Sequence, residues 1–118
     1  MKAIRGAITV KENKKEEIIE ATHFLMEEIK KLNKLDKDDI VSIITTATKD
    51  LDSSYPGDGI RLSGFDVPII CLQEQYVKDS LKKCIRLLIH IKDDRKISNV
   101  YVGEARRLRP DIYGDELW

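Results

Sequence analysis

The chain has 118 residues, of which 36% are charged, and its 21 basic and 21 acidic side chains cancel to a formal net charge of +0. This length predicts one domain that buries roughly two thirds of its unfolded surface. Proteins that bind nucleic acid or membrane surfaces in general carry excess positive charge, so the balance argues against both classes and requires any cationic site to be local.

The first expected element is a strand over residues 1–10. Ile4 and Ile8 lie on one face of this strand, and Arg5 lies on the other face among small residues, with room above it. Arg5 is therefore either an edge-strand arginine in solvent or part of a site. Gly6 suits a bulge or a close backbone approach, which favours the site.

A helix follows, with Asn13 as the expected N-cap and Asn33 near the expected end. His23 falls on its polar face beside glutamates, so we interpret it as a solvated surface histidine. Apolar and small residues at helical spacing predict the buried stripe, which consists of Ile18, Thr22, Leu25, Ile29 and Leu32.

The β-branched segment from Ile40 to Ala47 predicts an interior strand. The following region, residues 48–64, is dense in turn-forming residues and predicts a mobile loop with a short helix before Gly64. Tyr55 and Arg61 lie in this region. They either close over a ligand or belong to a plain surface loop, which is the commoner case.

Two apolar runs, at residues 67–72 and 85–91, predict two strands separated by a polar passage, and the first of them is expected to be buried. Strand alternation places Arg86 on one face with Leu88 and His90. An arginine in so apolar a strand is expensive to bury without an anionic partner. Glu74, at the exit of the preceding strand, is one candidate partner, and a bound anion is the other.

Residues 100–102 predict a last short strand in which Tyr101 points away from its valine neighbours. The fold class is therefore α/β, with a mixed sheet of about five strands and a long amphipathic helix in one domain over residues 1–118. The tail after about residue 110 is expected to be mobile. A basic patch for nucleic acid is a weak alternative, because acidic residues interleave with Arg106, Arg107 and Arg109.

Most familiar catalytic arrangements fail on this sequence. Neither histidine lies near a nucleophile-elbow motif, and the two cysteines, Cys71 and Cys84, form neither a C-x-x-C pair nor part of a metal-ligand cluster. Reduced thiols are favoured over a disulfide. The chain also lacks a signal-peptide core and an apolar run of about 20 residues, so we expect a cytoplasmic protein without a membrane span.

The remaining candidates are arginines, a glutamate, a thiol and a tyrosine, all at strand ends or in loops. Such a set suits a small polyanion that is held and stabilised electrostatically, without a metal or a cofactor.

Short motifs along nearly the whole chain then give a more specific indication. They are Ile4-Arg5-Gly6-Ala7, Thr9-Val10, Ser63-Gly64, Val67-Pro68, Cys71-x-Gln73-Glu74, Leu81-Lys82-Lys83-Cys84-Ile85-Arg86, Val100-Tyr101 and Leu108-Arg109-Pro110-Asp111. In their order and spacing the chain resembles the small, monofunctional, trimeric chorismate mutases of the mixed α/β class, as distinct from the all-helical class.

This resemblance implies the conversion of chorismate to prephenate by a cofactor-free [3,3]-sigmatropic rearrangement in the biosynthesis of phenylalanine and tyrosine. It also implies a homotrimer, built as a pseudo-α/β barrel, with three active sites between adjacent subunits. A non-catalytic trimeric module that binds an anionic metabolite would use the same residues and is the alternative.

The resemblance also implies roles for individual residues. Arg86 would contact the ether oxygen and a substrate carboxylate, which Arg5 and Tyr101 would also contact. Glu74 would accept the hydrogen bond of the ring hydroxyl, with Cys71 in support. The other implied substrate-binding residues are Tyr55, Arg61, Leu108 and Arg109, with Arg61 on the neighbouring subunit's side. Asp58 departs from the family pattern, which tends to have a basic residue there.

Overall fold

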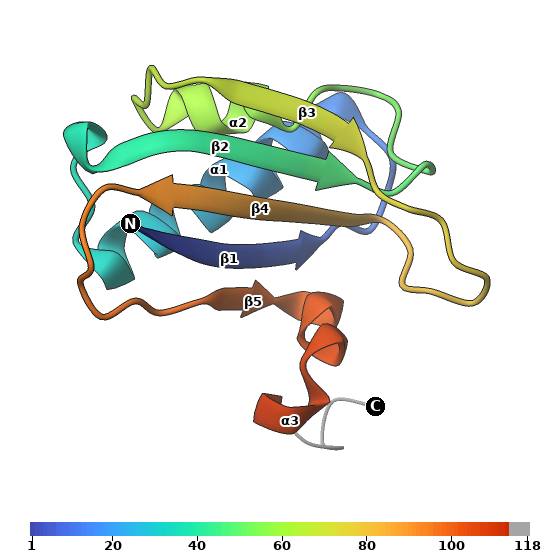
Figure 1. Ribbon diagram of the computed structural model, residues 1–118. Helices are drawn as coiled ribbons and strands as arrows, with labels where there is room; N and C mark the ends of the chain where they lie inside the picture. Colours follow the sequence, from blue (N-terminus) through green and yellow to red (C-terminus); the bar gives the residue numbers. More distant parts are fainter. Residues whose placement is uncertain (114–118) are drawn as a thin grey trace.

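A computed structural model of the chain describes residues 1–113 and contains one mixed sheet with helices behind it (Figure 1). The strands are β1 (Lys2–Thr9), β2 (Ile40–Ala47), β3 (Ile69–Gln73), β4 (Cys84–Ile91) and β5 (Val100–Val102). The α-helices are α1 (Lys15–Asn33), α2 (Gly57–Leu62) and α3 (Pro110–Tyr113), and two short 3-10 helices are η1 (Lys37–Asp39) and η2 (Gly103–Leu108).

The strand order across the sheet is β3-β2-β4-β1-β5. β4 runs antiparallel to both of its neighbours, β1 and β2, whereas β5 is parallel to β1 and β3 is parallel to β2. The prediction of a mixed sheet of about five strands with one long helix is therefore confirmed. The predicted mobile tail after residue 110 begins with α3, and residues 114–118 lie outside the described part of the chain.

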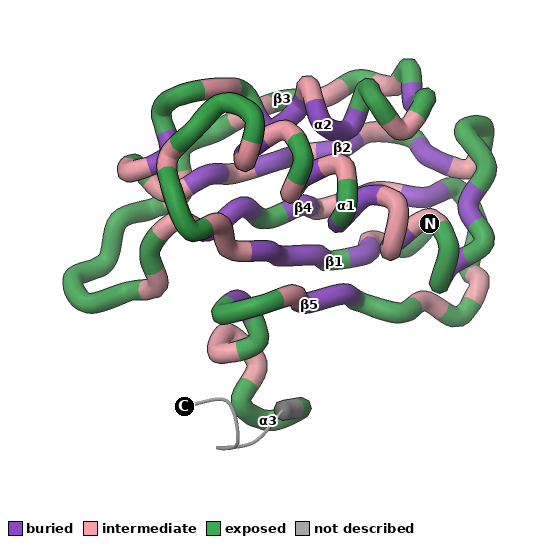
Figure 2. Tube along the Cα trace, turned by 180° about the vertical axis from the view of Figure 1, so that it is seen from behind, coloured by how far each residue is buried: buried purple, intermediate pink, exposed green. Residues whose placement is uncertain are grey.

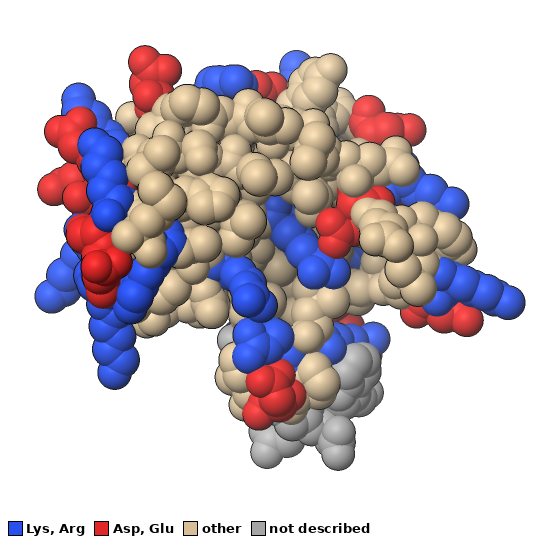
Figure 3. All heavy atoms as spheres, in the orientation of Figure 1, with Lys and Arg blue, Asp and Glu red and all other residues tan. Residues whose placement is uncertain are grey.

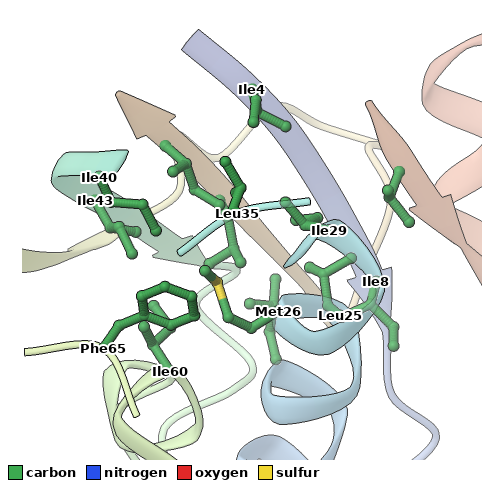
Figure 4. Packing of buried hydrophobic residues seen from close by; sticks show 14 of the residues in the cluster. Ile4, Ile8, Leu25, Met26, Ile29, Leu35, Ile40, Ile43, Ile60 and Phe65 are labelled. Carbon is green, nitrogen blue, oxygen red and sulfur yellow. The ribbon is translucent and has the colours of Figure 1, made fainter. Parts of the chain in front are cut away.

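The hydrophobic core lies between the sheet and the two helices α1 and α2, which cover the same face (Figures 1 and 4). Apolar side chains at alternate strand positions point into it, as strand geometry requires, and Figure 2 shows these buried stretches along the strands. The fully buried core side chains include Ile4, Leu25, Met26, Ile29, Ile43, Ile60, Ile85 and Ile89. The opposite face of the sheet has no helix over it among residues 1–113, and we call it the open face.

Two glycines allow the helices to pack this closely. A Cβ on Gly6 of β1 would lie 2.5 Å from Cδ1 of Ile29, so α1 rests directly on the strand backbone. A Cβ on Gly59 of α2 would lie 2.5 Å from the carbonyl oxygen of Ile19, so α2 rests on the α1 backbone. The close approach expected at Gly6 is confirmed, but it is the contact of α1 with the core face of the strand and does not by itself favour a site beside Arg5.

Three details predicted for α1 are wrong. The residue before the helix is Lys14, and Asn13 instead joins the chain to the loop at Asp52, whose carboxylate accepts a hydrogen bond from Asn13 Nδ2 at 2.6 Å. Leu32 is exposed, and Met26 is buried in its place. His23 is half-buried, with its Nδ1 3.0 Å from the Oγ of Ser63, because α2 packs against this side of the helix.

The strand predicted from residues 67–72 exists as β3, but it is not buried. β3 forms the edge of the sheet, and its open-face side chains Ile70 and Leu72 are 58% and 51% exposed. Strand order depends on pairings between distant segments, which an apolar run does not specify.

Candidate active site

A cavity of about 350 Å³ opens on the open face, where β1, β2, β4 and β5 run side by side. Its wall contains six of the nine residues proposed for the site from the sequence, which are Arg5, Glu74, Arg86, Tyr101, Leu108 and Arg109. These residues are separated by up to 104 positions in the chain, and the sheet brings them together.

The floor of the cavity is one row of paired residues across the sheet. Thr46 of β2 is paired with Arg86 of β4, Arg86 with Ala7 of β1, and Ala7 with Tyr101 of β5. Paired residues on one face lie about 5 Å apart at Cβ. The methyl group of Ala7 therefore leaves a hollow between the larger side chains of Arg86 and Tyr101.

Arg86 and Glu74 form an ion pair at the centre of this site. The Arg86 Nε and Glu74 Oε1 atoms are 2.7 Å apart, and the two side chains are 48% and 20% exposed. Figure 3 shows blue and red spheres meeting near the middle of the open face, with uncharged surface above them and further blue spheres below. Glu74 was thus a correct candidate partner, and Arg86 is half exposed because the face on which it lies is not covered.

This ion pair leaves donors for a ligand. A guanidinium has five N–H donors in a planar fork, so the terminal nitrogens of Arg86 still offer four N–H groups besides Nε–H. Glu74 likewise keeps lone pairs on both oxygens. The pair can therefore hold an anionic or hydroxylated ligand while it stays intact.

Further cationic groups surround the pair. Arg5 is exposed on β1, and its guanidinium makes no ion pair with any side chain among residues 1–113. Arg109 lies over the ring of Tyr101, 5.9 Å from its centroid, and pairs with Asp111 at 2.8 Å. This pairing holds the pKa of the Asp111 carboxyl below its ordinary value. The cavity wall therefore carries three arginines against one glutamate, which favours an anion.

The start of β4, which positions Arg86, is fixed by polar contacts. The carboxylate of Asp50 accepts hydrogen bonds from the backbone N–H of Lys83 at 3.0 and 3.2 Å and from the hydroxyl of Thr48. The backbone N–H of Cys84 donates to Thr48 Oγ1 at 3.0 Å. The strand that carries Arg86 is thus tied to the loop after β2.

The three remaining candidates, Tyr55, Arg61 and Cys71, lie elsewhere. Tyr55 and Cys71 line a second cavity of about 550 Å³ beside β3, which shares no lining residue with the first among residues 1–113. The Cys71 Sγ faces α2, 3.1 Å from where a Cβ on Gly57 would stand, so one chain does not bring Cys71 to Glu74. Arg61 projects from α2 and pairs with Asp58 at 3.0 Å.

Six residues that line the first cavity were not proposed as site residues from the sequence. They are Gly6, Ala7, Ile44, Thr46, Leu87 and Leu88. Strand alternation does place Ala7 with Arg5 and Leu88 with Arg86, but nothing in the sequence shows that β2 lies beside β4. The β2–β4 register was the missing information.

Neither thiol forms a disulfide. Cys84 is buried beside Ala7 and Tyr101. Burial raises the pKa of the Cys84 thiol from 9.0 to about 11, although the nearby Arg86 opposes this shift. The thiol is therefore protonated at neutral pH and is a poor nucleophile.

This raised pKa predicts a loss of stability at alkaline pH. The folded chain keeps the Cys84 proton at a pH at which the unfolded chain has lost it, so stability falls as pH rises from about 9 to about 11. Over this window we expect the free energy of unfolding to fall by about 2 kcal/mol more in the unsubstituted chain than in Cys84→Ala. Denaturant unfolding at a series of pH values measures the difference, and parallel curves for the two proteins would contradict it.

Other kinds of site find little support in the described residues. No three His, Cys, Asp or Glu side chains are grouped as metal ligands among residues 1–113. Within the same range no helix has both the length and the apolar character needed to cross a membrane. The basic residues near the C-terminus have acidic neighbours, since Arg107 pairs with Glu104 at 2.9 Å and Arg109 with Asp111.

Comparison with known proteins gives a consistent result. Residues 1–112 match the family described as chorismate mutase type I. The chorismate mutase AroH of Bacillus subtilis is 38% identical, with 95% of this chain and 92% of the relative covered, and that of Thermus thermophilus is 36% identical, with 95% and 96% covered. A solved chorismate mutase structure from Clostridium thermocellum has a TM-score of 0.87 and 40% identity, and covers 91% of this chain and 99% of its own.

Proposed function

Because the chain belongs to the type I chorismate mutase family, and is therefore an isomerase that converts chorismate to prephenate, we propose that two neighbouring copies of the chain share each active site. One copy supplies the first cavity, with Arg5, Glu74, Arg86 and Tyr101. The neighbouring copy supplies Tyr55, Arg61 and Cys71. The observation that carries this proposal is the separation of the nine candidate residues into two groups on one chain.

The open face supports an assembly of this kind. Ile70 and Leu72 expose large apolar side chains on it, and Ile44 and Leu88 lie half-buried beside them. Exposed apolar surface of this sort commonly marks a protein interface. We propose that the copies form a homotrimer through this face, as the family resemblance implies, with three sites related by rotation.

Arg86 is the central catalytic residue of the proposed mechanism. In the rearrangement the ether C–O bond of chorismate breaks while a C–C bond forms, and negative charge grows on the ether oxygen. The terminal nitrogens of Arg86 donate to this oxygen and to a substrate carboxylate, while Nε stays with Glu74. A donor that is fixed before the reaction and aimed at the developing charge stabilises the transition state more than the ground state.

The other residues hold the substrate in its reactive shape. Glu74 accepts a hydrogen bond from the ring hydroxyl, while Arg5 and Tyr101 bind carboxylate oxygens. Leu108 and Arg109 cover the cavity from the C-terminal side. No proton moves during the reaction, so a site without a general base is sufficient. Because these residues hold the substrate in its compact, reactive conformer, they lower the entropic part of the activation barrier.

The neighbouring copy adds charge and an aromatic wall. Arg61 of that copy faces the dianionic substrate, and Tyr55 lines the cavity. In the free chain Arg61 is paired with Asp58, three residues earlier on α2. The substrate therefore competes with Asp58 for Arg61, and an aspartate at this position weakens the attraction of the dianion to the site.

The direct test mixes the purified chain with chorismate in a buffer that contains a metal chelator. We expect chorismate to disappear and prephenate to form on the order of a millionfold faster than without protein, and sedimentation to give the mass of a trimer. Tight binding of a bicyclic transition-state mimic without turnover would instead support the non-catalytic binding module. A cytoplasmic location and the lack of nucleic-acid partners stay predictions.

A further inference from the structure

Two consecutive threonines of β2 carry buried hydroxyl groups without hydrogen-bond partners. Oγ1 of Thr45 and Oγ1 of Thr46 are both excluded from solvent, and neither is hydrogen-bonded to any group among residues 1–113. A buried polar group without a partner destabilises a fold, so each one calls for a physical explanation. The two side chains point to opposite faces of the sheet, because strand residues alternate.

The surroundings of the two hydroxyls differ. Thr45 is fully buried on the core side, between Ile43 and Ala47 of the hydrophobic core. Thr46 is in the wall of the active-site cavity and is paired in register with Arg86. The Thr46 hydroxyl therefore belongs to the site, and the Thr45 hydroxyl does not.

Thr46 also lies between the two members of the central ion pair. β2 separates β3, which leads into Glu74, from β4, which carries Arg86. The Glu74 backbone N–H donates to the carbonyl of Ala47 at 2.8 Å, on the β3 side of β2. Its carboxylate nevertheless reaches Arg86 Nε at 2.7 Å, on the β4 side. The Glu74 side chain thus crosses β2 near its end, and it lines the same cavity as Thr46.

We propose that Thr46 is a positioning residue for the rearrangement, and that its hydroxyl donates a hydrogen bond to the Glu74 carboxylate when substrate fills the cavity. This inference rests on the proposed function of Glu74. Glu74 must hold one oxygen against Arg86 and present lone pairs to the substrate hydroxyl at the same time. A contact from the strand beneath fixes the rotation of the carboxylate, as supporting hydrogen bonds do in preorganised sites.

The arrangement also accounts for the missing partner in the free chain. An unsatisfied hydroxyl costs stability before the substrate binds, and it gains its hydrogen bond only in the occupied site. In this proposal the Thr46 hydroxyl contacts Glu74 and not the substrate, whose carboxylates are held by Arg5, Arg86 and Tyr101, so its loss should leave KM nearly unchanged. The loss misaligns the Glu74 carboxylate, on which the geometry of the transition state depends, and is therefore expected to lower kcat.

The test compares Thr46→Val, which removes the hydroxyl at constant shape, with Thr46→Ser, which keeps it. We expect Thr46→Val to lower kcat about tenfold or more, since a hydrogen bond to a charged group is lost. KM should stay nearly unchanged and the thermal midpoint should stay equal or rise. Thr46→Ser should restore most of the turnover. Thr45→Val is the matched control, because it removes the other unpaired hydroxyl from the same strand, and its kcat should equal that of the unsubstituted chain.

A double substitution tests the route through Glu74. In a Glu74→Gln background, Thr46→Val should add little further loss, because residues that act through one another are not additive. The inference is overturned if Thr46→Val keeps full turnover, if Thr46→Ser is as slow as Thr46→Val, or if Thr45→Val is equally slow. In each of these outcomes the unsubstituted chain would still convert chorismate, so the proposed function would stand while this inference fails. If the unsubstituted chain is inactive, the proposed function fails and this inference fails with it.

Discussion

Arg86→Lys is expected to lower kcat/KM for chorismate by about a thousandfold while the chain stays folded. Lysine keeps the positive charge, but its ammonium group cannot hold Glu74 through one nitrogen and present parallel donors to two substrate oxygens. Arg86 is half exposed on the open face, so its replacement leaves the core intact. Steady-state kinetics measure the loss of turnover, and the thermal midpoint shows whether the fold is also destabilised.

Arg95→Lys is the matched control for this substitution. Arg95 also pairs with carboxylates, at 2.6 Å from Asp93 and 3.3 Å from Asp39, and donates to the carbonyl of Asn33 at the end of α1. It takes no part in either cavity. We expect Arg95→Lys to lower the thermal midpoint and to keep kcat. Near-normal turnover in Arg86→Lys would remove Arg86 from the centre of the mechanism.

Glu74→Ala is expected to lower kcat by about a hundredfold or more. The substitution removes both the acceptor for the substrate hydroxyl and the group that holds Arg86 Nε at 2.7 Å. Arg86 then loses its fixed orientation, and the alignment of its donors has to be established during the reaction. Glu74→Gln keeps the shape and one acceptor oxygen, so it should lose less activity than Glu74→Ala.

The control for Glu74 is Glu104→Ala. Glu104 forms a similar ion pair, with its Oε2 2.9 Å from Arg107 Nε, on the surface of η2. We expect its removal to leave both kcat and KM within about twofold, because surface ion pairs contribute little. Unchanged kinetics in Glu74→Ala would mean that Glu74 is a structural partner of Arg86 alone.

Much of the fold follows from local patterns in the sequence. The alternation around Arg5, Arg86 and Tyr101 placed these side chains on the correct face of their strands, and the position of Glu74 after a strand identified the partner of Arg86. These predictions needed only the period of a strand and the cost of an isolated charge.

The errors concern relations between distant segments. The run at residues 67–72 forms β3 at the edge of the sheet, where Ile70 and Leu72 are exposed. A buried strand would have the same apolar composition, so composition alone did not distinguish the two cases. The role of Thr46 depends on the register between β2 and β4, which no pattern within either strand specifies.

The separation of the candidate residues into two groups could not be derived from the residue pattern either. Tyr55, Arg61 and Cys71 have the chemistry expected of site residues, yet one chain holds Tyr55 and Cys71 in a second cavity and Arg61 on α2. A site that forms between copies leaves no spacing signal in one sequence. Only the resemblance to the trimeric chorismate mutases indicated this arrangement.

The measurement that tests the shared site most directly is activity after mixing two inactive variants, Arg86→Ala and Arg61→Ala. If Arg86 and Arg61 of one site come from different copies, random reassembly of the two variants gives about a quarter of the sites both arginines. We predict that turnover returns to about a quarter of that of the unsubstituted protein. The paired control mixes Arg86→Ala with Arg5→Ala, whose residues lie in the same cavity, and no activity should return. No recovery in the first mixture, with trimers still formed, would contradict the shared site.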